Sequence, residues 1–173
     1  MRVSFFARRR TPRLDRTSLV INGTLAGTTL FLRELKPQVA VVCADPFGAA
    51  MWSCFTNGNT DAKDGDSGVE GIGQSRVTKN LEAIALDRAY RIPDQEPLTI
   101  GYQLLRGEGI FLGLSPGINI AGVVRLARER GPGQTIVTLL CDSGRKYQSK
   151  LFNAGWLAAH RLDAGRRIES IFS

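Results

Sequence analysis

The apolar residues of this chain follow helical spacing in some segments and form uninterrupted runs in others. The spacing and the residue preferences predict helices over residues 24–35, 94–106 and 117–130. Two short runs rich in β-branched and other apolar residues, 39–44 and 135–141, predict buried strands. Because helical and strand segments are interleaved, the pattern predicts an α/β fold with a mostly parallel sheet flanked by helices.

The segment 56–68 interrupts this pattern, since it is rich in Gly, Asp, Asn and Thr and predicts a surface loop. Its acids Asp61, Asp64 and Asp66 lack the alternate spacing and the terminal glutamate of a calcium-binding loop. We therefore expect a solvated loop and no metal site here.

The composition indicates one globular domain, with 173 residues of which 43% are hydrophobic. No apolar run is long enough to cross a membrane, which needs about 18 residues or more. The three cysteines, Cys43, Cys54 and Cys141, show no C-x-x-C spacing, so neither a zinc site nor a disulfide framework is indicated. A reducing, cytoplasmic location is the simpler expectation.

Positive charge is concentrated in residues 1–18, which hold six arginines and one aspartate and carry +5 of the net charge of +7. The rest of the chain lacks the basic and aromatic alternation of a nucleic-acid surface. An export signal is also a poor match, because Asn22 and the pair Arg33–Glu34 interrupt the apolar residues that follow the arginines. We expect a disordered arm over 1–18 and no nucleic-acid or membrane partner.

Glycine and small polar residues occur together at three predicted strand-to-helix junctions, where backbone N–H groups are available to an anion. The junctions are residues 22–24, 113–117 and 142–144. Each one alone is more typical of a helix cap or turn, and the three together indicate a ligand site.

Three segments resemble the C-terminal part of bacterial cysteine synthases, which are pyridoxal-phosphate enzymes of the tryptophan synthase β-subunit-like fold. They read EGIGQSRV at 70–77, EGIFLGLSPGIN at 108–119, and CDSG with YQSKLFN at 141–144 and 147–153. The resemblance runs over 19–160 and implies a partial three-layer domain without the family's N-terminal half. Residues 161–173 are then expected to form a C-terminal tail.

The resemblance also implies roles in binding pyridoxal 5'-phosphate. Gly23 and Thr24 match the end of a G-T-G-G-T loop that binds the phosphate, and Ser115 matches a serine that hydrogen-bonds the pyridine nitrogen. Asp142 and Ser143 match the strand end beneath the ring. Gly71 and Gly73 match a loop on the substrate side.

The sequence departs from the family pattern at two places, and the first of them reduces the expected affinity for the cofactor. Residues 20–24 read V-I-N-G-T in place of G-T-G-G-T, so side chains replace glycines that allow close approach of the phosphate. Pro116 replaces a small residue after Ser115 and removes one backbone N–H at a helix start, where proline is tolerated. Binding by this chain is accordingly expected to be weak or absent.

The family's cofactor-binding lysine and its substrate-carboxylate loop have no counterpart in these 173 residues. The five lysines, at positions 36, 63, 79, 146 and 150, lie on predicted helix faces or polar loops and are expected at the surface. No catalytic residue is therefore assigned, and the chain is expected to be inactive alone. Cys141, at the end of a predicted buried strand, is expected to be a buried and unreactive thiol, and His160 offers no evident catalytic pair with it.

The main hypothesis is a truncated cysteine synthase, whose family reaction converts O-acetylserine and sulfide to cysteine with an amino-acid substrate. A second hypothesis is a non-catalytic module that forms a homodimer or pairs with an intact homologue, because a half-domain leaves apolar surface uncovered. A relative of cystathionine β-synthase or of a diaminopropionate-forming enzyme is equally compatible with these motifs.

Overall fold

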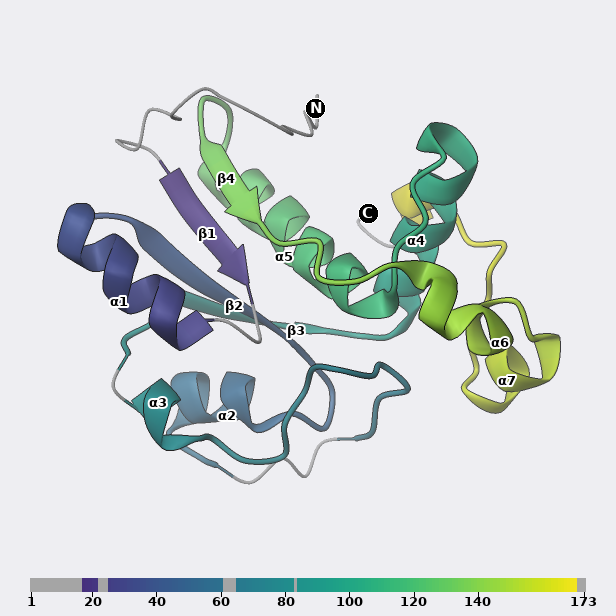
Figure 1. Ribbon diagram of the computed structural model, residues 1–173, viewed down its shortest axis with the longest axis horizontal. Coiled ribbons are helices and arrows are strands. Elements are labelled where there is room, and N and C mark those ends of the chain that lie inside the picture. The colour runs from purple at the N-terminus through teal and green to yellow at the C-terminus, as the bar shows by residue number, and fades with distance from the viewer. Residues whose placement is uncertain (1–16, 22–24, 61–64, 83, 171–173) are drawn as a thin grey trace.

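Four parallel strands form a single sheet in the order β3-β2-β1-β4 (Figure 1). The computed structural model describes residues 17–21, 25–60, 65–82 and 84–170. The strands are β1 (Thr17–Ile21), β2 (Ala40–Pro46), β3 (Arg88–Ile92) and β4 (Thr135–Thr138). The α-helices are α1 (Leu25–Leu35), α2 (Ala50–Asn57), α3 (Lys79–Glu82), α4 (Gln95–Glu108), α5 (Leu114–Arg130), α6 (Gln148–Leu151) and α7 (Ala154–Ala159). Two short 3-10 helices, η2 (Gly144–Tyr147) and η3 (Ile168–Ser170), complete the described elements.

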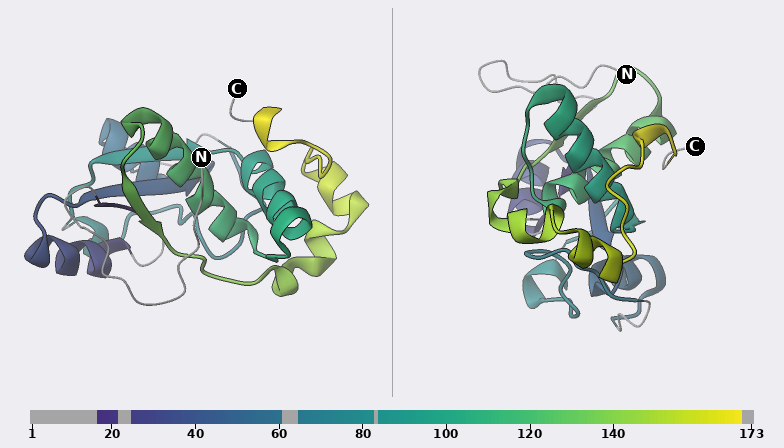
Figure 2. Two further views of the ribbon diagram at one scale, coloured as in Figure 1. Left: turned by 90° about the horizontal axis from the view of Figure 1, so that it is seen from above. Right: turned by 90° about the vertical axis from the view of Figure 1, so that its right-hand side faces the viewer.

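Helices cover both faces of the sheet, and the central strand β2 shows why (Figure 2). Its alternate residues Val41 and Cys43 pack in one apolar cluster with residues of α1 and α2. Val42 and Ala44 pack in the other cluster, with residues of α4 and α5. Because successive side chains of a strand point to opposite faces, a strand that is buried along its whole length must lie between two helical layers.

The structure confirms the predicted α/β class, the parallel sheet and the three predicted helices. It adds two strands, β1 and β3, and the shorter helices α2, α3, α6 and α7, which the apolar pattern did not predict. The first strand begins at Thr17, so the last two residues of the predicted arm belong to the sheet. Residues 1–16 lie outside the described part of the chain.

The prediction of a buried strand over 135–141 is wrong in both length and burial. The strand β4 has four residues and occupies an edge of the sheet, where it pairs with β1 alone. Val137 is 39% exposed, and Leu139 and Leu140, which follow the strand, are 43% and 38% exposed. The apolar run therefore predicted a strand correctly but did not indicate that the strand lies at the edge of the sheet.

The segment after α7 is attached to the start of α4. The side chain of Gln95 donates to the carbonyl of Asp163 at 2.7 Å and accepts from the backbone N–H of Asp163 at 2.9 Å. These reciprocal bonds fix the predicted tail to the body of the domain. None of the helices in the described ranges is both long and apolar enough to cross a membrane.

Candidate functional site

The start of α5 and the segment after β4 meet through backbone hydrogen bonds. Leu112 and Ser143 form an isolated antiparallel bridge, and the N–H of Gly113 donates to the carbonyl of Asp142 at 3.3 Å. Ser115, 5% exposed in the first turn of α5, donates to Oδ1 of Asp142 at 3.4 Å. The structure thus brings three predicted cofactor residues, Ser115, Asp142 and Ser143, to one place.

Gly113 lets the Asp142 carboxylate approach the backbone closely, because a Cβ here would displace that carboxylate and the ring of Tyr147. The close approach fixes the carboxylate against the first turn of α5. Sequence pattern alone indicated a cap or turn at this glycine, whereas the structure shows a contact between distant segments.

The second oxygen of the Asp142 carboxylate accepts a hydrogen bond from the Tyr147 hydroxyl. This bond, together with burial, raises the pKa of Tyr147 to about 12. Both carboxylate oxygens are therefore engaged, one by Ser115 and one by Tyr147.

Asn119, one turn after Ser115, is fully buried and was not predicted as a site residue. Its side-chain amide donates to the carbonyl of Leu139 at 2.9 Å and to the sulfur of Cys141 at 3.6 Å. Its Oδ1 has no hydrogen-bond partner in the described residues. Two signals were available in the sequence: Asn119 is the last residue of the motif at 108–119, and it is a polar residue within a predicted helix.

Cys141 is exposed, so the prediction of a buried thiol is wrong. The reason is the edge position of β4, which leaves the residues after the strand without a neighbouring strand to cover them. Local desolvation and the adjacent Asp142 carboxylate still raise the pKa of the Cys141 thiol, against hydrogen bonds to Asn119 and Ser115 that lower it. The thiol is accessible but weakly ionised.

A second group of predicted residues lines a hollow of about 500 Å³. Gly71 and Gly73 border it together with Ala26, in the first turn of α1. The other lining residues are Met51, Ile72, Gln74, Thr78, Asn80 and Leu81. The first-turn N–H groups of a helix attract anions, and the first turn of α1 holds no acidic side chain. Gly23 and Thr24, which precede α1, lie outside the described residues.

The loop that carries Gly71 and Gly73 needs glycine for backbone reasons at both positions, with φ of +79° and +81°. A Cβ on Gly73 would lie 2.6 Å from the ring of Pro46, at the end of β2. The neighbouring carbonyl of Gln74 accepts from the N–H of Ala50 at 2.9 Å. One end of the loop is therefore fixed against the carboxyl end of the sheet.

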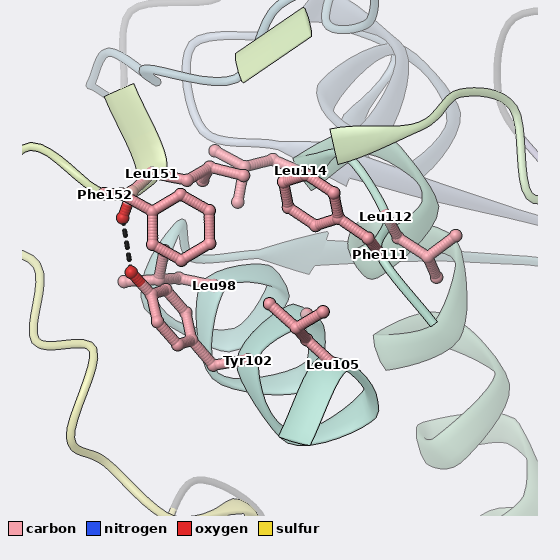
Figure 3. A pocket seen from close by; sticks show the side chains of 9 residues that line it. Leu98, Tyr102, Leu105, Phe111, Leu112, Leu114, Leu151 and Phe152 are labelled. Atoms are coloured by element: carbon pink, nitrogen blue, oxygen red, sulfur yellow. Dashed lines mark hydrogen bonds between the residues drawn. The ribbon is translucent and has the colours of Figure 1, made fainter. Parts of the chain in front are cut away.

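An apolar cavity between α4 and α6 is not a ligand site (Figure 3). Leu98, Tyr102 and Leu105 of α4 face Phe111, Leu114 and Phe152 across it. Its volume of about 10 Å³ is barely that of one water molecule. The Tyr102 hydroxyl donates to the carbonyl of Leu151 and closes one side.

A parallel α/β sheet with a glycine loop and a helix start beside its carboxyl edge is typical of enzymes that bind a phosphorylated cofactor. The chain belongs to the pyridoxal-phosphate dependent enzyme family, whose sequence model matches residues 22–142. The resemblance read from the sequence motifs is thereby confirmed.

Within this family, the chain is similar to cysteine synthases and to a cystathionine beta-synthase. A cysteine synthase of Dictyostelium discoideum is 36% identical over 149 residues, covering 81% of this chain and 39% of that protein. Cysteine synthase 2 of Schizosaccharomyces pombe is 35% identical over 147 residues, covering 78% of this chain and 37% of that protein. The solved structure of the O-acetylserine dependent cystathionine beta-synthase from Helicobacter pylori superposes with a TM-score of 0.69 at 26% identity, over 79% of this chain and 44% of that one. The chain therefore spans roughly two fifths of the length of the curated relatives it matches.

The described residues offer two separate features that suit pyridoxal phosphate, the hollow beside α1 and the hydroxyl of Ser115. The hollow lies within the roughly 300–1,000 Å³ of small-molecule sites, and the start of α1 borders it. The hydrogen bond from Ser115 to Asp142 is long at 3.4 Å, which leaves the hydroxyl able to bond another acceptor. However, Ser115 does not line the hollow, so the two groups of predicted residues are separate in the described part of the chain.

The lysines of the described ranges do not line the hollow. Three are exposed, Lys36, Lys79 and Lys146, and Lys150 forms an ion pair with Glu70. Lys63 lies outside the described residues. Nor do the described residues contain a cluster of three or more His, Cys, Asp or Glu that could hold a metal ion.

Proposed function

We propose that this chain forms the C-terminal part of the cofactor domain of a β-replacement enzyme of the cysteine synthase type. The observation that carries the proposal is the hollow bordered by the start of α1 and the Gly71–Gly73 loop, in a chain of the pyridoxal-phosphate family. When bound, the cofactor supplies the electron sink that allows the leaving group of an activated serine to depart. O-acetylserine with sulfide is the proposed substrate pair, with homocysteine or an amine as the alternative nucleophile.

In this proposal the start of α1, with Gly23 and Thr24, binds the phosphate, and Ser115 hydrogen-bonds the pyridine nitrogen. To do so, the single hydrogen of the Ser115 hydroxyl must leave Oδ1 of Asp142, to which it is bound only by a long contact of 3.4 Å. A neutral hydroxyl at this position leaves the ring nitrogen without a full positive charge, which suits β-replacement. Gly71 and Gly73 give the amino-acid substrate close access to the backbone.

We further propose that these 173 residues bind the cofactor reversibly and are inactive alone, in the cytoplasm. Support comes from the positions of the described lysines, which are exposed or paired. Covalent cofactor chemistry needs an unpaired amine inside the site.

The test is titration of purified protein with pyridoxal phosphate, followed by dialysis and by borohydride treatment. We expect a cofactor signal that dialysis removes and that borohydride does not fix to the chain. Ser115→Ala should weaken binding, and Ser149→Ala, at an exposed serine of α6, should not. Covalent incorporation, or no binding at millimolar cofactor, would contradict the proposal.

A second candidate function is a module that pairs with an intact enzyme of the family, and the exposed edge of β4 favours it. Edge strands that expose apolar residues are prone to pair with other chains, and natural proteins usually protect them. The opposite edge, β3, carries Arg88, which pairs with Glu129 at 3.3 Å. On this alternative, the intact Dictyostelium relative should co-purify with the chain, and Leu139→Asp should abolish the complex. A chain that stays monomeric in the presence of that relative would exclude it.

A further inference from the structure

The carboxylate of Asp94 is hydrogen-bonded to the loop that carries Gly71 and Gly73. Its Oδ1 accepts from the Ser67 hydroxyl at 2.6 Å, and its Oδ2 accepts from the backbone N–H of Gly68 at 2.7 Å. The Ser67 hydroxyl in turn accepts from the N–H of Val69 at 3.1 Å. Three consecutive loop residues are thus folded around one side chain.

This use of Asp94 differs from the ordinary role of an aspartate before a helix. Asp94 is the residue immediately before α4, where an aspartate usually accepts from the first-turn N–H groups of its own helix. Here its side chain makes no such capping bond. Its two carboxylate oxygens accept instead from Ser67 and Gly68, which precede Asp94 by 27 and 26 positions in the sequence.

The rest of the loop is supported unevenly. Gly68 rests against α7, where a Cβ would lie 3.0 Å from the rings of Trp156 and His160. The ion pair of Glu70 with Lys150 is half exposed and adds little. Gly71 is exposed and has open space around it. The loop is therefore held near Asp94 and near Gly73, Ile72 packs against the main apolar cluster, and Gly71 is the least supported residue.

The helix that follows Asp94 also contacts the helix that carries Ser115. A Cβ on Gly117 would lie 2.7 Å from the Cα and carbonyl oxygen of Pro97, so the first turns of α5 and α4 touch through backbone atoms. The position of Asp94 is therefore fixed relative to that of Ser115 by this contact between the two helices.

We propose that Asp94 is a positioning residue, which sets the place of the Gly71–Gly73 loop over the hollow relative to Ser115. The functional part of this inference rests on the proposed function, in which the loop faces the substrate. The structural part does not, because it concerns only what holds the loop.

The experiment compares hydrogen exchange of the full chain in the wild type, Asp94→Ala and Asp94→Asn, without cofactor. Loss of two hydrogen bonds to a charged group should speed exchange of the loop amides of Gly68 and Val69, which are hydrogen-bonded in this cluster, by at least about tenfold in Asp94→Ala, with α5 unchanged. Asp94→Asn keeps one acceptor oxygen and should give an intermediate increase, which covers the case in which the alanine variant does not fold. The matched control is Asp87→Ala, which removes bonds to Val41 N–H and Arg33 away from the loop and should leave loop exchange unchanged.

Unchanged loop exchange in both Asp94 variants, or an equal rise in the loop and in α5, would overturn the assignment. A second measurement adds pyridoxal phosphate: the wild-type loop should gain protection, and the alanine variant should gain less. If the wild type binds no cofactor, the proposed function fails while the cofactor-free exchange still decides the role of Asp94.

Discussion

The contact between α4 and α5 predicts opposite effects of the same substitution at two helical glycines. In Gly117→Ala, the added Cβ would meet Cα, Cβ and O of Pro97, each at 2.7 Å. Carbon atoms pack best at about 3.5–4.0 Å, so the two helices would have to separate by roughly 1 Å. Overpacking of this kind costs about 1–3 kcal/mol, and it exceeds the gain of about 1 kcal/mol from replacing a helical glycine by alanine. We expect a net loss of up to about 2 kcal/mol in the free energy of unfolding.

Gly101→Ala is the matched control, because nothing lies within 4 Å of the added Cβ in the middle of α4. Only the helix preference remains there, so the variant should gain about 0.5–1 kcal/mol. Urea unfolding followed by far-ultraviolet circular dichroism measures both, at an unchanged slope. For a chain of this size, 1 kcal/mol corresponds to about 2–4 °C in the melting temperature. A Gly117→Ala variant at least as stable as the wild type would refute the reasoning.

Three further predictions concern titratable groups. Ellman's reagent should modify Cys141 long before the buried Cys43, with a rate that still rises above pH 9, because the pKa of the exposed thiol is raised. Burial raises the pKa of Glu96 above its ordinary value of 4.5 despite its arginine partner, so protonation favours the folded state. The stability of the wild type should therefore fall relative to Glu96→Gln as the pH rises from 4 to 7, and a constant difference in urea unfolding would argue against this. The pKa of Tyr147 is raised to about 12, so its stabilising contribution is full below pH 10 and is lost above it. The stability difference between the wild type and Tyr147→Phe should accordingly be constant from pH 6 to 9 and shrink beyond pH 10.

The apolar pattern identified the strand β2, part of β4 and the three long helices, and it missed the inner strand β1 and the edge strand β3. The strand β2 was predicted because it is buried along its whole length. The strand β3 was missed because Arg88 and Arg91 alternate with apolar residues at an edge, and Arg91 stacks on the ring of Trp52 at 3.8 Å. Sheet order depends on contacts between distant segments, which explains why the burial of β4 was also predicted wrongly.

The sequence motifs predicted which residues belong to the candidate site, but not which of them lie next to each other in the structure. The motifs located Ser115 and Asp142, whose meeting depends on the bridge between Leu112 and Ser143. Asp94 lies in none of the motifs, and Asn119 ends one of them without an assigned role, because both roles depend on where the loop and the β4 segment return to the helices. Cofactor contacts of Gly23, Thr24, Ser115, Asp142 and Ser143 remain predictions.

The close contact between the first turns of α4 and α5, at Pro97 and Gly117, restricts how these two helices can move when a ligand binds. Helix ends that touch through backbone atoms have no side chains between them to rearrange, so they cannot slide or hinge apart at low cost. In the loop that borders the hollow, Gly71 has open space around it, so a local change of shape on ligand binding would cost least there.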